Sequence, residues 1–204
     1  TTGQFVGYIG RNGSGQCKWC TSGAPVAPAG NGTGGITNPV HLMINTTADT
    51  ISVVDTGNPS TISPVISVYT LSTGDYLPGS AVVLTQGYLS AGGNVAGKVQ
   101  IADVTSSGTT TLYAALGSRL QKLNPDTGAF GGWIGRNNGG SINSTWASGT
   151  SIEGFDEQAF SWLSAVAYDG AGHLLTGDGM HVTDIAQPAI KKWDLATGNY
   201  LGSL

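Results

Sequence analysis

Short runs in which apolar and polar residues alternate, separated by turns that contain Gly, fill the C-terminal part of the chain. Alternation with a period of two is the pattern of a half-buried β-strand, and a Gly-containing turn between two such runs favours a hairpin. The pattern predicts a four-stranded antiparallel meander with strands at Trp162–Tyr168, His173–Asp178, Ala189–Leu195 and Asn199–Leu204.

The same kind of pattern predicts two further meanders upstream. The strands of the first are expected at Val40–Asn45, Thr50–Asp55, Val65–Thr70 and Asp75–Leu77. Those of the middle one are expected at Lys98–Val104, Thr110–Ala115, Arg119–Leu123 and Ala129–Ile134. For the first strand of the middle meander Ala81–Leu84 is an alternative, and we favour Lys98–Val104.

A sequence repeat connects the three meanders. The phrase GAFGGWIGRN at 128–137 nearly repeats GQFVGYIGRN at 3–12, and 198–202 is a shorter echo. Each phrase begins with a Thr-Gly pair that is followed one residue later by Phe or Tyr, and such pairs lie at Thr2-Gly3, Thr73-Gly74, Thr127-Gly128 and Thr197-Gly198. Units that bury only part of their apolar surface must stack on neighbours, so the repeat predicts an array. The units exceed the roughly 40 to 50 residues of a simple four-stranded blade, so each should contain an insertion.

Composition agrees with an all-β fold. The chain has 33 Gly, only 10% charged residues and no long helix-forming run, which is typical of many short strands joined by turns. With 39% apolar residues, 204 residues suffice for one sizeable core. We therefore predict a single domain over 1–204, with units at about 1–79, 80–135 and 136–204.

Charge excludes two classes of partner. A net charge of -4 with eight Lys and Arg leaves no basic stripe to neutralise phosphates, so neither nucleic acid nor an anionic membrane surface is expected. No apolar stretch approaches the roughly 20 residues of a membrane span, so membrane insertion is not expected, and no signal segment stands at the start. The chain begins at Thr without Met, and we expect it to be a piece of a larger or processed protein.

Several segments resemble the NHL-repeat β-propellers. They are Asn38-Pro39 before a strand, ISVVDTGN at 51–58, RLQKL at 119–123 and DTGAF at 126–130. The opening phrase through Trp19-Cys20 is similar to bacterial surface NHL proteins, in which a GWIG strand precedes a Gly-rich loop with a Trp-Cys pair. The chain departs from the full motif, because Pro59 replaces the usual residue before the Arg and Ser118 stands where Asn is usual. The resemblance implies a β-propeller-like array of about three four-stranded antiparallel blades.

Three blades are too few for a closed propeller, which usually has about 4 to 8. Three arrangements are consistent with this number: further blades lie outside this chain, identical chains associate to complete a ring, or the three units form an open arc. The first strand, Gly3–Gly10, matches the fourth strand of a blade whose other strands are absent, so it should pair with another chain or with the edge of the first unit. We expect a homo-oligomer.

Two insertions, Arg11–Asn38 and Arg136–Ser161, both follow the Ile-Gly-Arg-Asn phrase. The first contains Cys17 and Cys20, the only cysteines. A C-x-x-C can be a redox pair, half of a zinc site, a local disulfide or two free thiols. No βαβ pattern and no second Cys or His pair accompanies it, so we predict a disulfide that staples the loop, and with it an extracellular or cell-surface location.

Surface loops on a rigid scaffold are where binding residues concentrate. Aromatic rings in the insertions could cover the apolar face of a sugar or anchor a protein interface. The predicted ligand-binding residues are Arg11, Trp19, Arg136, Asn143, Trp146, Phe155 and Asp156, and Phe160 belongs to the same group of loop aromatics. The alternative for each ring is that it folds down to pin its own loop, and for each Arg that it makes a structural bond. Tyr8, Trp133 and Tyr200 recur at equivalent positions, which favours core packing.

Enzymatic chemistry is not expected. Glu153, Asp156 and Glu157 could act as general acid and base in glycoside cleavage, and Asp178 with Asp184 could bind calcium, although no twelve-residue calcium loop is present. No nucleophile elbow, zinc-protease motif or phosphate-binding loop occurs. We therefore predict no catalytic residue, cofactor or metal. The predicted function is an extracellular or cell-surface binding module, of adhesin or fibre-tip type, that recognises a glycan or a surface protein. The alternatives are a carbohydrate-active hydrolase or lyase, or a purely structural fibre domain.

Overall fold

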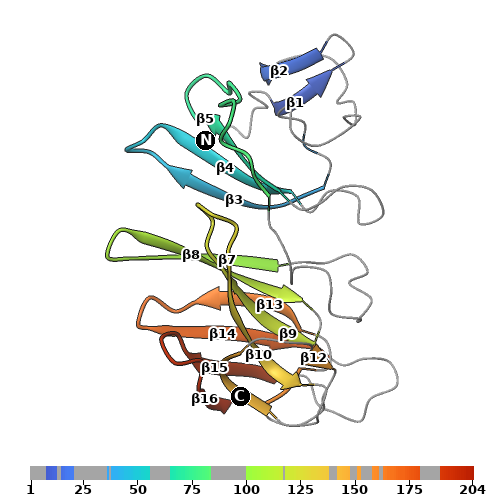
Figure 1. Cartoon of the computed structure of the whole chain (residues 1–204), viewed down its shortest axis with the longest axis vertical. Helices are drawn as coiled ribbons and strands as arrows, with labels where there is room; N and C mark the ends of the chain where they lie inside the picture. The colour runs from blue at the N-terminus through green and yellow to red at the C-terminus, as the bar shows by residue number, and fades with distance from the viewer. Residues whose placement is uncertain are drawn as a thin grey trace. The chain divides into compact units, whose positions relative to one another are not determined.

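The structure is a computed structural model that describes residues 8–12, 15–20, 36, 38–55, 65–83, 100–116, 118–137, 142–147, 151–152, 158–160, 163–179 and 189–204. The chain divides into two compact units, Thr1–Leu84 and Thr85–Leu204 (Figure 1). All described regular elements are β-strands, as the composition and the alternating pattern predict. The organisation of 1–204 as one domain stays a prediction.

The first unit contains a four-stranded antiparallel sheet and a separate hairpin (Figure 1). The sheet has the order β3 (Pro39–Asn45), β4 (Thr50–Asp55), β5 (Val65–Thr70) and β6 (Val82–Val83). The hairpin pairs β1 (Tyr8–Asn12) with β2 (Gly15–Cys20). The partner of the first strand is therefore a strand of its own insertion.

The fourth strand of this sheet corrects the sequence prediction. At the predicted position, Asp75–Leu77, only Tyr76 forms an isolated bridge, to Tyr69, and regular pairing with β5 resumes at β6. Pro78 has no N–H to donate, and Gly79 takes a φ of 80°, so a turn interrupts the strand here. The segment considered as an alternative first strand of the middle meander, Ala81–Leu84, thus contributes β6 to the first sheet.

The second unit contains two sheets. The first has the order β11 (Ile142–Ala147), β10 (Phe130–Asn137), β9 (Arg119–Leu123), β8 (Thr109–Leu116) and β7 (Gln100–Ser106), and β12 (Ser151–Ile152) also pairs with β10. The second has the order β13 (Leu163–Tyr168), β14 (His173–Asp178), β15 (Ala189–Asp194) and β16 (Tyr200–Ser203). The middle and last meanders are confirmed. The first strand of the middle one lies in the favoured segment and not at Ala81–Leu84, with described bounds of Gln100–Ser106 in place of the predicted Lys98–Val104.

The same turn follows the third strand of each of the three meanders. The N–H of the residue that opens the turn donates a hydrogen bond to the carbonyl oxygen five positions later. The N–O distances are 2.8 Å for Thr70 to Asp75, 2.9 Å for Asn124 to Ala129 and 2.8 Å for Asp194 to Asn199. The Gly of each Thr-Gly pair takes a positive φ, of 73°, 69° and 80° at Gly74, Gly128 and Gly198. A residue with a Cβ is costly in this region. The repeated Thr-Gly pair is therefore the sequence mark of this turn.

One apolar core holds the two sheets of the second unit together. Leu120 and Ile134 from β9 and β10 are buried with Leu163 and Leu174 from β13 and β14, and the rest of the cluster is Val104, Tyr113, Ala115, Phe160 and Trp193. The prediction of core packing is confirmed for Trp133, which is fully buried, and for Tyr200, whose ring lies 5.3 Å from that of Trp193. Tyr8 is half-buried.

The first unit has a smaller core. Ile51, Val53 and Tyr69 are buried on one face of the sheet, and Ile9, Ile36, Leu71 and Tyr76 pack against them. The described part of the chain contains no helix that could span a bilayer. The closure of a ring and the number of its blades stay predictions.

Gly135 should be the glycine that tolerates substitution least. A Cβ at this position would lie 2.8 Å from the carbonyl oxygen of Ser118, and its φ is 143°. We expect Gly135→Ala to lower the free energy of unfolding by about 3 kcal/mol or more. Gly108 has a φ of 78° with nothing within 4 Å of its added Cβ, so Gly108→Ala should cost only about 1 kcal/mol. Urea denaturation checks the difference, and equal losses would contradict it.

Candidate functional site

The two insertions begin with equivalent hairpins. In the first, Tyr8 lies opposite Cys20 and Gly10 opposite Cys17. In the second, Trp133 lies opposite Ala147 and Gly135 lies opposite Asn143. Trp133 and Gly135 occupy the repeat positions of Tyr8 and Gly10. Both ladders are irregular between these two positions, as at a β-bulge. The insertions therefore start as strands that fold back on the Ile-Gly-Arg-Asn strand, which the sequence analysis did not predict.

The shared register places two predicted ligand-binding residues at one repeat position. Trp19 stands one residue before the partner of Tyr8, and Trp146 stands one residue before the partner of Trp133. The tryptophans share no surrounding motif, so sequence comparison alone does not relate them. They are the equivalent aromatic residues of two equivalent hairpins.

Trp146 packs down on the sheet that its hairpin extends. Its ring lies 5.5 Å from that of Tyr113 on β8, and Nζ of Lys122 on β9 lies 5.4 Å from its centroid, within cation–π range. Tyr113 is buried, and this desolvation raises its pKa to about 12. The indole Nε1 of Trp146 is buried with no hydrogen-bond partner among the described residues. Trp146 thus anchors β11 across β10.

Trp19 makes a comparable attachment in the first unit. Its indole Nε1 donates a hydrogen bond of 3.0 Å to the carbonyl oxygen of Leu71, in the turn after β5. The side chain remains 37% exposed. Both tryptophans therefore hold the start of an insertion on its scaffold, which is the alternative considered for them, and ligand contact by either stays a prediction.

The remaining predicted ligand-binding residues are placed unevenly. Arg136 is half-buried near the end of β10. The backbones of Arg11 and Asn143 lie in β1 and β11, and their side chains are outside the described residues. So are the side chains of Cys17 and Cys20, and with them the predicted disulfide. Phe155 and Asp156, the acidic residues Glu153 and Glu157, and the pair His181 and Asp184 also lie outside the part of the chain that the structure describes.

Phe160 corrects the expectation of an exposed loop aromatic. It is fully buried, and its ring lies 5.2 Å from that of Trp193. The sequence places it just before β13, among polar residues where little core was expected. The core between the two sheets extends to this loop segment, so Phe160 is a packing residue.

A buried ion pair beside Phe160 was missed by the sequence analysis. Nζ of Lys191 lies 2.7 Å from Oδ2 of Asp178, donates to the carbonyl oxygen of Ala159 and lies 5.4 Å from the centroid of the Phe160 ring. Asp178, considered above for calcium, is thus engaged by a cation of its own sheet. The strand pattern did indicate a buried Lys, because Lys191 and Trp193 are two residues apart and their side chains point to the same, buried face of β15.

Two buried polar residues on β9 have unpaired atoms. Nε and Nη2 of Arg119 and both amide atoms of Gln121 lack a hydrogen-bond partner among the described residues. Desolvation lowers the pKa of Arg119 to about 10. A buried guanidinium without a counter-charge destabilises the folded state. No group of three or more His, Cys, Asp or Glu side chains suited to a metal ion lies among the described residues.

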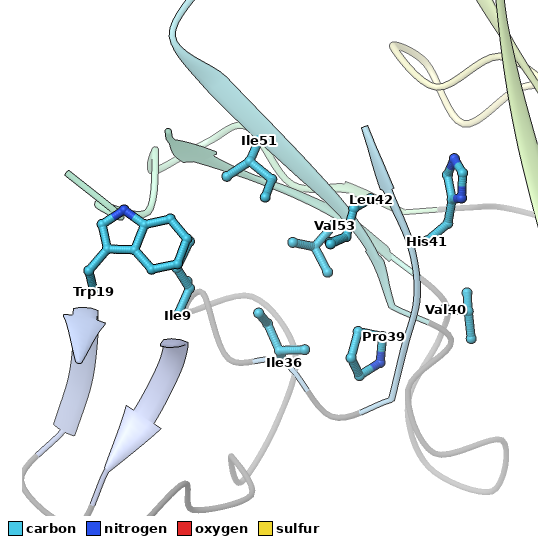
Figure 2. A pocket seen from close by; sticks show the side chains of 9 residues that line it. All are labelled: Ile9, Trp19, Ile36, Pro39, Val40, His41, Leu42, Ile51 and Val53. Carbon is cyan, nitrogen blue, oxygen red and sulfur yellow. The ribbon is translucent and has the colours of Figure 1, made fainter. Parts of the chain in front are cut away.

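The first unit has an open apolar cavity of about 610 Å³ between the hairpin and the sheet (Figure 2). Its lining is Ile9, Trp19, Ile36, Pro39, Val40, His41, Leu42, Ile51 and Val53. Figure 2 shows Trp19 and Ile9 on the hairpin side and Ile51 and Val53 on the sheet side. The indole N–H of Trp19 is already used by Leu71. The lining therefore offers apolar contact rather than a set of converging polar groups.

Comparison with known proteins adds little beyond the fold class. No family model matches the chain, and no curated protein matches it. A solved structure, a crystal structure of a nidogen/laminin complex, is similar with a TM-score of 0.45 and 16% identity, over 83% of this chain and 48% of that one. The chain thus spans about half the length of that neighbour. What stands is an all-β chain with three four-stranded antiparallel meanders, and the NHL resemblance rests on the residues quoted for it.

Removal of Lys191 should be strongly destabilising. Lys191→Met leaves Asp178 buried without its cation, which typically costs about 3–5 kcal/mol. The adjacent Lys192 offers a matched control, because its Nζ lies 3.6 Å from Oδ2 of Asp169 and its side chain is 43% exposed. Lys192→Met should change the free energy of unfolding by less than about 1 kcal/mol. Urea denaturation of both variants is the measurement, and similar losses would show that the buried pair contributes nothing special.

Replacement of Arg119 should act in the opposite direction. Arg119→Met keeps the length of the side chain and removes a buried cation whose Nε and Nη2 lack a partner among the described residues, so the free energy of unfolding should rise by about 1–3 kcal/mol. Gln121→Met tests the same idea for a neutral amide and should give a smaller gain. A loss of stability in Arg119→Met would indicate a partner for the guanidinium that the described residues do not provide.

Proposed function

We propose that the chain is a non-enzymatic recognition module that binds a partner protein through the two insertions that follow β1 and β10. The observation on which this rests is the pair of equivalent hairpins, each held on its sheet by a tryptophan. Long loops that start from such fixed bases have the architecture of binding loops on a scaffold. The ligand-contacting residues would then lie further along each insertion, where Phe155 and Asp156 remain candidates. Asn143 is also a candidate, but it lies in β11 at the base of its insertion.

A protein is favoured over a glycan by the way the tryptophans are used. Stacking on a sugar requires an aromatic face that is open to solvent. The ring of Trp146 is in contact with Tyr113 and Lys122, and the ring of Trp19 lines an apolar cavity. The main support for glycan binding in the sequence is thereby weakened, whereas apolar and mixed loop surfaces suit protein interfaces. A glycan partner is the second outcome that the experiment must be able to reveal.

The location belongs to the same proposal. The pair Cys17 and Cys20 in one insertion, together with the low content of charged residues, supports an extracellular or cell-surface setting. Catalysis by the acidic residues of the second insertion, Glu153, Asp156 and Glu157, is the competing function. It predicts turnover that is lost in Glu153→Gln, Asp156→Asn or Glu157→Gln.

Parallel arrays of extracellular proteins and of glycans, probed with the labelled chain, test the proposal. We expect binding to protein spots that falls at least about tenfold when residues 21–35 or 153–157 are replaced by Gly and Ser at equal length, with β12 left intact. The melting temperature should change little, because the anchoring tryptophans are retained. Thr105→Ala, on the exposed β7–β8 hairpin, is the control and should bind normally.

Other results on these arrays have distinct meanings. Binding to glycan spots alone would replace the protein partner by a sugar. Binding that survives both loop replacements would place recognition outside the insertions. Absence of binding on both arrays would contradict recognition and favour a structural role in a fibre.

A further inference from the structure

The cavity of the first unit and the core of the second unit are the same part of the repeat. Paired residues of the two sheets establish the correspondence. Pro39 lies opposite Asp55 as Leu163 lies opposite Asp178, and Leu42 lies opposite Val53 as Val166 lies opposite Thr176. Ile51 lies opposite Tyr69 as Leu174 lies opposite Trp193. The sheet side of the cavity in Figure 2 therefore corresponds to the β13–β14 side of the core.

The hairpin side of the cavity corresponds in the same way. Ile9 and Ile134 share the Ile-Gly-Arg-Asn phrase, and Trp19 and Trp146 share one position of the bulged hairpin. Ile36 and Phe160 each stand three residues before the equivalent positions Pro39 and Leu163. In the second unit Ile134, Phe160, Leu163 and Leu174 belong to the core cluster, with Trp146 and Val166 packed against it.

Four members of that cluster have no counterpart among the described residues around the cavity. Val104, Tyr113, Ala115 and Leu120 come from β7, β8 and β9. The consequence is visible in exposure, because Leu163 is buried whereas its equivalent Pro39 is exposed. Leu42 is 53% exposed, whereas its equivalent Val166 is half-buried. The cavity thus lies where four apolar side chains of three strands would stand.

The edge of β1 supports the same conclusion. Its counterpart β10 pairs with β11 on one side and with β9 on the other, whereas the described pairing of β1 is with β2, the counterpart of β11. The sequence before β1 contains Thr2-Gly3, which matches the Thr127-Gly128 pair of the turn that joins β9 to β10. In the repeat, a strand equivalent to β9 comes immediately before this turn.

We propose that the cavity is the seat of a three-stranded antiparallel meander, equivalent to β7–β9, that precedes β1 in the same polypeptide. Its third strand pairs with the edge of β1 that faces away from β2, and its apolar side chains, at the positions of Val104, Tyr113, Ala115 and Leu120, fill the cavity. With β1 as its fourth strand, this meander is a complete blade stacked on the β3–β6 sheet.

A second copy of the chain is a less suitable occupant. The outer face of the β13–β16 sheet does present Ile190 and Leu204, which exchange backbone hydrogen bonds at the repeat positions of Leu120 and Ile134. They are 52% and 95% exposed. Suppose that this face of a second copy covered the cavity as β7–β10 cover β13 and β14 in the second unit. Leu204 would then need the position that Ile9 already occupies. The occupant must supply three strands and leave the fourth to β1.

The test is an extended chain in which residues 100–127 of this protein are placed directly before Gly3, so that Thr127 precedes Gly3 as it precedes Gly128. We expect its melting temperature to rise by at least about 5 °C and its binding of the apolar dye anilinonaphthalene sulfonate to fall at least about twofold. A matched extension with Val104→Ser, Tyr113→Ser, Ala115→Ser and Leu120→Ser in the added segment should show neither change.

Leu42→Asp provides a second measurement that does not depend on the size of those shifts. In the original chain Leu42 is exposed, so the substitution should shift the melting temperature by less than about 2 °C. In the extended chain the same side chain is covered, and the loss should be at least about 5 °C.

Three results would overturn the proposal. The first is equal dye binding and melting temperature in the original and extended chains. The second is an equal effect of Leu42→Asp in both. The third is a dimer of the original chain in light scattering that becomes a monomer with Leu42→Asp, because a second copy would then be the occupant. None of these measurements depends on the binding of a partner by the insertions.

Discussion

Each sheet in this chain is apolar on a face that only a neighbouring sheet can bury, and the rest of the structure depends on that constraint. In the second unit the constraint is met, because Leu120 and Ile134 close over Leu163 and Leu174. In the described part of the first unit, the β1–β2 hairpin lies over the equivalent face. Ile9 packs on this face, but Leu42 is exposed and a cavity is left between hairpin and sheet. One rule therefore accounts for both the tight core and the open one.

The strands could be predicted because their information is local. Alternation sets the period, and the Thr-Gly pair marks a turn that needs a left-handed residue, so the bounds of β13–β16 follow closely from the sequence. The fourth strand of the first sheet was wrong because a Pro-Gly turn shifts regular pairing from Tyr76 to β6. Neither β2 nor β11 could be predicted, since a short segment in a Gly-rich insertion becomes a strand only through the edge of β1 or β10.

The site was less predictable than the fold, for a related reason. Trp19, Trp146 and Phe160 were singled out as aromatic residues in polar surroundings, but what an aromatic ring touches depends on contacts that are distant in sequence. Phe160 meets Trp193, and Trp146 meets Tyr113. The Lys191–Asp178 pair is likewise a contact between separate strands. A Lys on the inward side of an alternating strand was the one local sign that a buried carboxylate should be sought.

The division of work within each insertion follows from these contacts. The hairpin at its start is fixed on the scaffold by its tryptophan. In one unit the indole donates a hydrogen bond to a backbone carbonyl, and in the other the ring packs against Tyr113 and Lys122. A side chain engaged in this way resists change, since its loss frees the whole loop. Ile36 and Phe160, near the end of each insertion, are packed on the scaffold as well. The specificity of a recognition module of this type can therefore change between these fixed points without disturbing the stacking of the sheets.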